Sequence, residues 1–345
     1  MKYRIYTTSR KAWSAMIRAI SQAQTSIYIE MYIFLDDTSG HHDFIGLLKS
    51  KAQSGVEVII VADAFGSSSL KKQTIADLKA AGVDFLFFSH FLRWTHRKVV
   101  IIDNRIAFLG GVNIENKMIN WHDIQIEING RKTVRALLRS FAYTYKMCGG
   151  HNQKIINFYK KTLLKKIESL VLESLPNHNL YAIADYYKNR LLNAKESIKI
   201  VTPYFIPPRW LIALFDGALK RGVKIEIIIP KDTDVKILNR INYFNIQRLM
   251  ALGINFYAAP TMNHAKILII DNAEGLIGSQ NIDALSFGRN FEIGAFFRQK
   301  DLVRDLNAIF EKWKKQAQSY QNLNIKLTGL DKIKIRILRL FFSIL

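Results

Sequence analysis

The sequence predicts an α/β protein of two related halves, each a mixed β-sheet flanked by helices, followed by a C-terminal amphipathic helix. Helical and strand-like apolar patterns alternate along the chain. The pattern of the first half also returns about 170 residues later. A chain of 345 residues is long enough for two domains or for one duplicated domain.

Apolar periodicity defines the elements of the first half. Spacing typical of helices covers residues 13–23, 44–52 and 73–81, and the last of these helices is expected to end at Gly82. Strand-like apolar runs cover residues 26–34, 56–62 and 98–103. This alternation predicts a sheet with helices on both faces, and we expect the same arrangement in the second half.

Three short segments support a duplication. Residues 26–30 resemble 197–201, residues 55–60 resemble 222–227, and residues 82–85 resemble 253–256, at offsets of 171, 167 and 171 residues. We therefore expect a first half over 1–148, a connecting segment over 149–178, a second half over 179–322 and a tail over 323–345. The basic stretch 154–173 is interpreted as a connecting helix, with either a solvated or a membrane-facing surface.

One motif occurs in both halves and indicates chemistry. It has the form H-x-K, four residues, then D, and it is followed by two small residues, any residue and Asn. The first copy consists of His96, Lys98, Asp103, Gly111 and Asn113, and the second of His264, Lys266, Asp271, Ser279 and Asn281. Two matched copies are far less probable as a purely structural coincidence than one, so we expect one site built from two halves.

The residue types of the motif suit a phosphodiester. Residues i and i+2 of a strand share a face, so His and Lys of each copy should point together. Two ammonium groups and two amides would bind a tetrahedral oxyanion without a metal, and we expect neither a metal nor a cofactor. One histidine would attack phosphorus, and the other would protonate the leaving alcohol and then deprotonate the second acceptor.

Carboxylates are expected to support this site. Each imidazole needs a partner that fixes its tautomer, and candidates lie 27 and 28 residues after the two histidines, at Asp123 and Glu292. Asp103 and Asp271 end the motif strands and are alternatively anchors of local structure. The stiff aromatic loop over 202–208, with three prolines, suits either the wall of a pocket or a plain surface turn.

Charge and the C-terminal tail suggest an anionic partner. The chain has 50 Lys and Arg against 28 Asp and Glu, a net charge of +22, which attracts anionic membranes and nucleic acids. On a helical wheel the tail has a narrow basic stripe and a wide apolar face, typical of a helix in a membrane interface; packing on the protein's own core is the alternative. The residues proposed for membrane contact are Lys332, Arg336, Arg339, Phe341 and Phe342.

Cellular location is constrained only weakly by the sequence. The one cysteine, Cys148, excludes an internal disulfide and fits a reducing compartment. We find no signal peptide and no apolar run long enough to span a bilayer. We therefore expect a peripheral protein on the cytoplasmic face of the cell membrane, with no obligate protein partner.

These motifs resemble the phospholipase D superfamily over residues 10–315, and within it the bacterial cardiolipin synthases. Further matching segments are Trp121-His122-Asp123, the loop 202–207 and the segment from Asn281 to Glu292. The resemblance implies a metal-independent site shared by two halves, with His96 as nucleophile and His264 as acid and base. It also implies transfer of a phosphatidyl group from phosphatidylglycerol to a lipid alcohol. Leu285 departs from the family pattern, which has Arg there, and the N-terminal transmembrane pair of many members is absent, so the tail is a candidate replacement.

Three functions remain open at this point. The first is the membrane-surface phosphatidyltransferase. The second is a phospholipase D-type phosphodiesterase that hydrolyses phospholipid or nucleic acid, which the +22 charge would also suit. The third is a basic scaffold without activity, which the two intact sets of His, Lys and Asn argue against.

Overall fold

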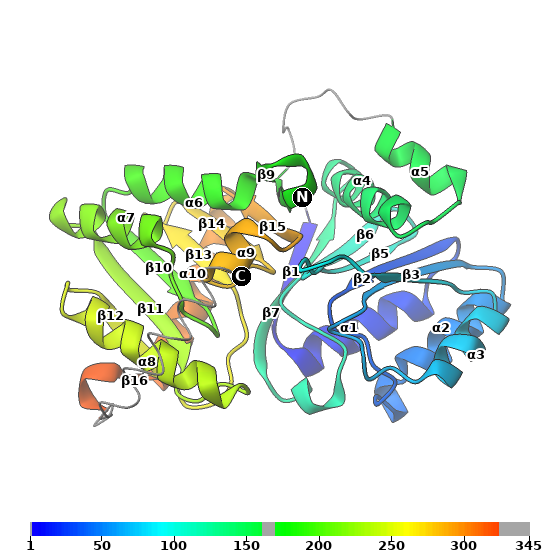
Figure 1. The fold of residues 1–345 in the computed structure, drawn as a ribbon, viewed down its shortest axis with the longest axis horizontal. Coiled ribbons are helices and arrows are strands. Elements are labelled where there is room, and N and C mark those ends of the chain that lie inside the picture. The colour runs from blue at the N-terminus through cyan, green and yellow to red at the C-terminus, as the bar shows by residue number, and fades with distance from the viewer. Residues whose placement is uncertain (1, 161–169, 324–345) are drawn as a thin grey trace. The chain divides into compact units, whose positions relative to one another are not determined.

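The computed structural model describes residues 2–160 and 170–323, and these form two compact units, described here one at a time (Figure 1). The first unit comprises residues up to Glu173 together with Phe291–Gly294, and the second comprises Ser174–Asn290 with the residues from Ala295 onward. The short segment Phe291–Gly294 belongs by sequence to the second repeat, yet it packs with the first unit. The expected tail, including Lys332, Arg336, Arg339, Phe341 and Phe342, lies outside the described residues.

The first unit is built on a seven-stranded mixed sheet of order β1-β7-β6-β5-β2-β3-β4. Strands β2, β3 and β4 are parallel, β5 is antiparallel to β2, and β1, β7 and β6 continue the antiparallel part. The elements are β1 (Lys2–Thr8), α1 (Ser9–Ser21), β2 (Ser26–Met31), α2 (Phe44–Gln53), β3 (Glu57–Asp63), α3 (Lys72–Ala80), β4 (Asp84–Phe88), β5 (Lys98–Ile102), β6 (Ile106–Gly110), β7 (His122–Asn129), α4 (Arg131–Met147) and α5 (Gln153–Lys160), with short 3₁₀ turns at Gly40–His42 and Asn116–Met118.

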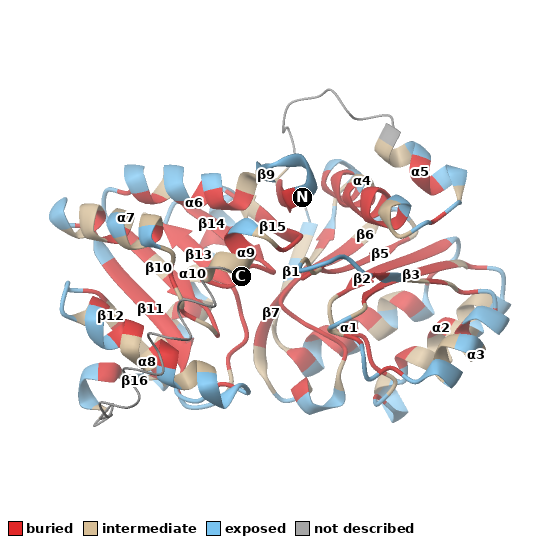
Figure 2. Ribbon diagram, viewed as in Figure 1, coloured by how far each residue is buried: buried red, intermediate tan, exposed pale blue. Residues whose placement is uncertain are grey.

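Helices cover both faces of this sheet, as predicted. Helices α1, α2 and α3 lie on one face and α4 on the other (Figure 1). Alternate residues of β2 enter the core under α1–α3, among them Ile27, Ile29 and Met31, while Tyr28 and Glu30 face α4. Strands β2, β3, β5 and β6 are buried along nearly their whole length, and the helices expose their outer faces (Figure 2).

The second unit contains a nine-stranded mixed sheet of order β16-β12-β11-β10-β13-β14-β15-β8-β9. Its parallel strands β10, β11 and β12 and the antiparallel β13 repeat the arrangement of β2, β3, β4 and β5. The elements are β8 (Val171–Leu175), β9 (Leu180–Tyr181), α6 (Ala182–Asn193), β10 (Ser197–Val201), α7 (Arg209–Lys220), β11 (Lys224–Pro230), α8 (Lys236–Met250), β12 (Asn255–Ala259), β13 (Ile267–Ile270), β14 (Glu274–Gly278), α9 (Ala284–Gly288), β15 (Glu292–Phe297), α10 (Lys300–Gln316) and β16 (Gln318–Ser319), with 3₁₀ turns at Pro176–His178 and Tyr320–Asn322.

The structure differs from the sequence prediction in two places. The polar start of the chain forms β1, whose side chains are largely half-buried and which pairs with β7 at the edge of the sheet. The predicted helix over 154–173 was wrong at its end, because Val171–Leu175 is strand β8. All five residues of β8 are buried, and a short run covered on both faces lacks the alternation that distinguishes a strand from a helix.

Candidate active site

The motif histidines lie at corresponding edges of the two sheets. In the first unit, β5 starts where the parallel strands β2, β3 and β4 end, because β5 is antiparallel to β2 and Lys98 pairs with Met31. His96 lies just before this strand. In the second unit β13 is likewise antiparallel to β10, and His264 lies just before it. The carboxyl ends of parallel strands are the usual place for polar groups in such sheets, and both histidines are buried there.

Each motif lysine returns to its own histidine. Lys98 Nζ donates to the backbone carbonyl of His96 at 2.5 Å, and Lys266 Nζ donates to that of His264 at 2.6 Å. Both lysine side chains are almost completely buried. The matched geometry holds each ammonium on the backbone of its own histidine. An ammonium group has three N–H donors, so a bond to the carbonyl does not prevent contact with a phosphate oxygen.

His96 is oriented by a carboxylate from a distant part of the sequence. Its Nδ1 lies 3.0 and 3.2 Å from the two carboxylate oxygens of Glu292, and Glu292 is fully buried. Glu292 follows His264 by 28 residues, so sequence order associates it with the second motif, but the structure places it on the first. With Nδ1 bonded to the carboxylate, Nε2 becomes the ring nitrogen suited to react at phosphorus.

The segment that carries Glu292 is held against the first motif by backbone bonds. The Phe291 amide donates to the Trp94 carbonyl at 2.9 Å, and the His96 amide donates to the Phe291 carbonyl at 2.9 Å. A parallel bridge joins Thr95 to Phe291. These bonds explain why a segment of the second repeat packs with the first unit.

A buried ion pair lies behind this segment. Arg97, the variable residue of the first motif, has no exposed surface, and its guanidinium lies 3.6 Å from the Glu30 carboxylate and over the Phe291 ring. Its Nη1 also donates to Ser140 at 2.7 Å, while Thr95 donates to Glu30 at 2.5 Å. Burial raises the pKa of Glu30, and the charge of Arg97 opposes that rise.

The second unit has no such pair at the corresponding positions. Strand register equates Glu30 with Val201 and Arg97 with Ala265, and both of these apolar residues are buried. The two motifs therefore have matched catalytic residues in different surroundings.

Sequence reasoning did not identify two tyrosines beside the histidines. The Tyr32 ring meets the His96 ring edge-on at 4.8 Å and lies under Lys98 Nζ at 4.9 Å. In the second unit the Tyr204 ring meets His264 edge-on at 6.4 Å, and its hydroxyl donates to Asp234 at 2.6 Å. A tyrosine shortly after the first parallel strand of each repeat, β2 and β10, was the available signal.

The motif asparagines differ in their contacts. Asn113 Oδ1 accepts the Ile33 amide at 3.2 Å, and its own carbonyl accepts the Trp13 indole N–H at 2.8 Å. Asn281 is held through its amide, which donates to Ser286 Oγ at 3.0 Å, and its side-chain Oδ1 is buried without a hydrogen-bond partner among the described residues. A buried polar oxygen of this kind is a candidate ligand contact.

The motif aspartates close turns. Asp103 has a positive φ of 50°, and its carboxylate accepts the amides of Gln24, Thr25 and Ser26. Asp271, with φ of 51°, accepts three consecutive amides in the same way, those of 195–197. Burial would raise the pKa of Asp103, but these amide bonds outweigh burial and lower it. The geometry is that of a local structural anchor rather than a reacting group.

The remaining supporting residues are buried beside the motifs. Asp123 lies on β7, and its Oδ1 accepts the Ile124 amide at 2.7 Å. The amide of Gly111 donates to the Ile124 carbonyl at 2.9 Å, and the preceding Gly110 passes so close that a Cβ would lie 2.2 Å from that carbonyl oxygen. Ser279 is fully buried after β14. The small residues thus let the motif backbone pass close to the next strand.

Two asparagine side chains of α8 hold the loop over 202–208. The Asn242 side chain accepts the Phe205 amide at 2.8 Å and donates to the Pro203 carbonyl, and Asn245 donates to the Phe205 carbonyl at 2.9 Å. The loop pairs with Ile282, directly after Asn281. It therefore lies beside the second motif of its own unit.

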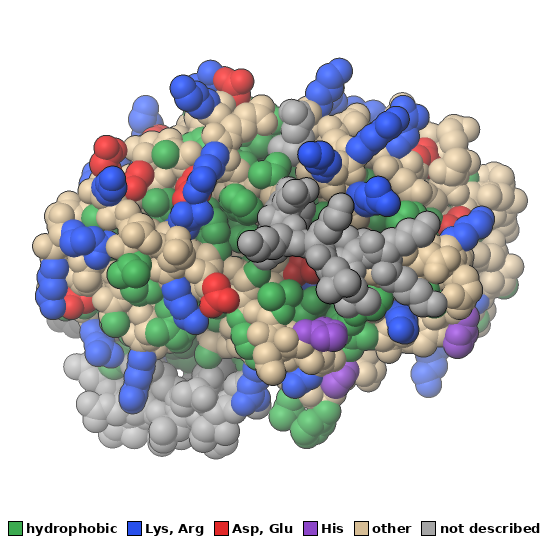
Figure 3. Space-filling view, turned by 90° about the horizontal axis from the view of Figure 1, so that it is seen from above, with side chains coloured by type: hydrophobic (Ala, Val, Ile, Leu, Met, Phe, Trp, Pro, Cys, Tyr) green, Lys and Arg blue, Asp and Glu red, His purple; other side chains and the backbone are tan. Residues whose placement is uncertain are grey.

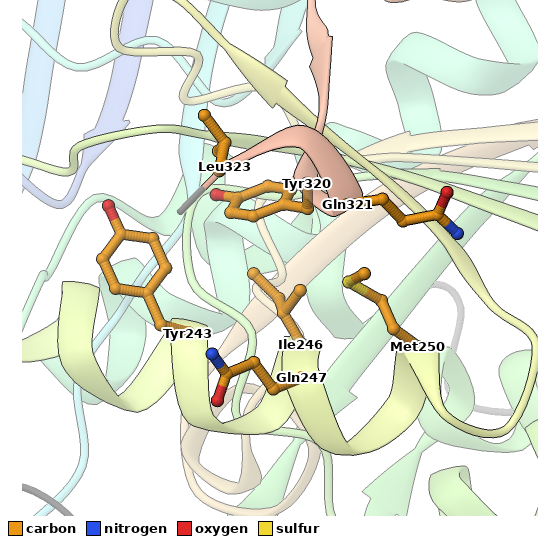
Figure 4. Close-up of a pocket in the computed structure, with 7 residues that line it drawn as sticks. All are labelled: Tyr243, Ile246, Gln247, Met250, Tyr320, Gln321 and Leu323. Carbon is orange, nitrogen blue, oxygen red and sulfur yellow. The ribbon is translucent and has the colours of Figure 1, made fainter. Parts of the chain in front are cut away.

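A separate cavity does not involve these residues. It has a volume of about 180 Å³ and lies between α8 and the 3₁₀ turn at Tyr320–Asn322 (Figure 4). Its lining is Tyr243, Ile246, Gln247, Met250, Tyr320, Gln321 and Leu323. It contains no motif residue and no charged side chain, so it lacks the groups that phosphoryl chemistry needs.

No cluster of three or more His, Cys, Asp or Glu side chains within residues 2–160 and 170–323 is arranged to hold a metal ion. Over the same part of the chain, no helix has both the length and the apolar character required to cross a bilayer.

A duplicated α/β fold with a buried His–Lys pair at each sheet edge defines a phospholipase D-like protein. Comparison with known proteins agrees. A family model described as cardiolipin synthase, phospholipase D-like domain, matches residues 16–145 and 187–314. The chain therefore belongs to the cardiolipin synthase family of phospholipase D-like enzymes.

Relatives with curated names extend over most of the chain. A probable cardiolipin synthase of Bacillus subtilis is 27% identical over 99% of this chain and 72% of its own length. A cardiolipin synthase of Clostridium perfringens is 30% identical over 89% of this chain and 69% of its own length. Both matches include the two repeats.

A solved structure confirms the fold. The phosphatidylserine synthase of Haemophilus influenzae superposes with a TM-score of 0.76 at 14% identity, covering 98% of this chain and 93% of that one. The predicted two-half α/β architecture is thereby confirmed.

Proposed function

We propose that the protein is a phosphatidyltransferase of cardiolipin-synthase type, which moves a phosphatidyl group from phosphatidylglycerol to a lipid alcohol. The observation that carries the proposal is the duplicated motif, with His96 oriented by Glu292 and each lysine beside its histidine. Membership of the cardiolipin synthase family supports the lipid substrate. We further propose that the two motifs act together as one centre.

The first chemical step uses the histidines in opposite protonation states. Neutral His96 attacks phosphorus through Nε2, forming a P–N bond while the P–O bond to the glycerol head group breaks. Protonated His264 gives its proton to the departing glycerol oxygen. The Glu292 carboxylate stabilises the positive charge that develops on the His96 ring.

The second step reverses these roles. His264, now neutral, removes the proton from the hydroxyl of a second phosphatidylglycerol, whose oxygen attacks phosphorus and breaks the P–N bond. The two lysines and the two motif asparagines bind the non-bridging oxygens in both steps. The products are cardiolipin and glycerol, and His96 is regenerated.

We propose a peripheral location on the cytoplasmic face of the cell membrane, where phosphatidylglycerol supplies an anionic surface. The net charge of +22 supports this location, and on the face drawn in Figure 3 Lys and Arg side chains clearly outnumber Asp and Glu. The same charge favours one alternative, a phosphodiesterase that hydrolyses phospholipid or nucleic acid.

Product analysis by mass spectrometry tests the proposal. Purified protein is incubated with phosphatidylglycerol vesicles without added metal, beside the variants His96→Ala and His264→Ala. Cardiolipin plus glycerol from the wild type alone is the expected result. Phosphatidic acid alone would mean hydrolysis, and no lipid product would direct the search to single-stranded DNA.

A further inference from the structure

Three apolar side chains of the first unit face solvent at the edge where His96 lies. Phe91 is 87% exposed, Phe65 67% and Leu92 41%. Phe65 follows β3, and Phe91 and Leu92 follow β4, so all three leave the sheet at the carboxyl end of its parallel strands. We call these three residues the apolar tip. Clustered exposed apolar side chains of this size mark a contact surface in soluble proteins.

One residue of the apolar tip, Leu92, has an unfavourable backbone conformation. His90 and Arg93 form an antiparallel bridge, and Phe91 and Leu92 are the two central residues of the turn between them. Leu92 has a positive φ of 52°, a region that suits Gly or Asn and is unfavourable for leucine. Glycine or asparagine there would remove both the strain and the apolar surface of Leu92. A strained residue that also exposes apolar surface indicates function.

The apolar tip is fixed to the catalytic segment through one carboxylate. Asp63 Oδ1 accepts the amides of Phe65 and Gly66 at 3.0 and 2.9 Å, and its Oδ2 accepts the amide of Thr95 at 2.8 Å. Thr95 immediately precedes His96. The Phe65 ring also packs on the Trp94 ring at 5.8 Å between centroids. A surface that binds Phe65 therefore lies next to the two residues that precede His96 in the chain.

The charges around the apolar tip fit an anionic surface. Residues 64–76 and 85–102 contain no Asp or Glu. Within them Lys71 and Lys72 are exposed, with the Lys71 ammonium 4.0 Å from the Asp36 carboxylate, and Arg93 is half-buried. Exposed aromatic side chains flanked by cations are the pattern of a segment that enters the interface of an anionic bilayer.

We propose that Phe65, Phe91 and Leu92 insert into the interface of a phospholipid bilayer and bring the His96 edge of the first unit to the lipid head groups. The proposal rests on the proposed function, because a phosphatidyltransferase finds its substrate in that interface. It assigns a membrane contact to the folded first unit, separate from the C-terminal tail. A single-stranded nucleic acid, which also stacks on aromatic side chains beside cations, is the competing ligand.

Fluorescence quenching in the full-length protein tests insertion directly. The variant Phe91→Trp places a reporter at the tip, and Leu192→Trp places one on an apolar side chain that is 58% exposed on α6 of the second unit. Vesicles contain phosphatidylglycerol and phosphatidylcholine, with a lipid quencher in the acyl region. We expect added quenching for Phe91→Trp above wild type and none for Leu192→Trp. Equal quenching in wild type and Phe91→Trp overturns the proposal. A change in the fluorescence of Phe91→Trp when single-stranded DNA is added, with no change when vesicles are added, overturns it as well.

A second variant links insertion to turnover. Phe91→Ser combined with Leu92→Asn removes two of the three exposed apolar side chains and relieves the positive φ, so folding is retained. The ratio of turnover on vesicles to turnover on short-chain phosphatidylglycerol below its micelle concentration should fall at least about tenfold, while Leu192→Gln keeps the wild-type ratio. An unchanged ratio in the double variant refutes the proposal. Loss of the proposed function itself looks different, because wild-type protein would then yield no lipid product on either substrate.

Discussion

Replacing Arg97 by methionine should destabilise the first unit, because it leaves the Glu30 carboxylate buried without its cation. Arg97 is 0% and Glu30 1% exposed, and the two groups lie 3.6 Å apart. Breaking a buried pair costs about 3–5 kcal/mol. Glu30 retains its bond from Thr95, and its raised pKa makes protonation easier, so we expect a value near the lower end, about 3 kcal/mol.

The double variant Glu30→Met with Arg97→Met separates charge from volume. Methionine roughly preserves the length of both side chains, and apolar replacement of a whole buried pair is often neutral. The second unit already has apolar residues at these positions, Val201 and Ala265. We therefore expect the double variant to lie within about 1 kcal/mol of wild type.

Urea unfolding with hydrogen exchange of the β2 and β5 amides measures these values for the first unit alone. Exchange is needed because a chain of two compact units does not have to unfold in one step. A loss below about 1 kcal/mol in the single variant, or a double variant as unstable as the single one, would refute the reasoning.

Three other predictions concern carboxylates. Glu292→Gln retains the side-chain shape but not the charge that supports His96. Turnover should therefore fall about 100-fold, with the melting temperature nearly unchanged. Turnover within a few-fold of wild type would contradict the proposed role. Burial raises the pKa of Asp63 to about 6, so its contribution to stability is complete below about pH 3.8 and is lost as pH rises through about 6. The variant Asp63→Asn should therefore lose this pH dependence of the free energy of unfolding, which is at most about 1.4 kcal/mol per pH unit in that window. The same pH dependence in wild type and variant, measured by urea unfolding, would rule this out. Asp103→Ala and Asp271→Ala should each lower the free energy of unfolding by about 1–3 kcal/mol, measured by thermal or urea unfolding. A loss of stability in only one of the two variants would contradict the prediction.

The sequence supported correct predictions where the signal is local or repeated. Helices α1–α3 and strands β2, β3 and β5 lie within a few residues of the predicted bounds, because the periodicity of apolar residues indicates such elements directly. The turn-closing role of Asp103 was anticipated as one of two alternatives, since a carboxylate at a strand end commonly binds nearby amides. The duplication identified the corresponding residue, Asp271, without further information.

Long-range pairing was beyond the sequence. Nothing near Glu292 indicates that it bonds to His96, 196 residues earlier, because that contact depends on how the two repeats fold together. The buried Arg97–Glu30 pair was equally hidden, since arginine usually marks exposed surface. Strand β1 was missed because it is a half-buried edge strand with a polar sequence.

The exchanged segment Phe291–Gly294 restricts how this duplicated protein could have been derived from a single-repeat ancestor. A gene fragment that ends before Phe291 would encode the first sheet without the carboxylate that orients His96. When the two repeats are expressed as separate polypeptides, we expect activity only after they are mixed. The polypeptide of the second repeat must then include the four residues 291–294. The orientation of His96 thus depends on a four-residue peptide from the other repeat, so neither repeat alone contains all the groups of the first motif's site.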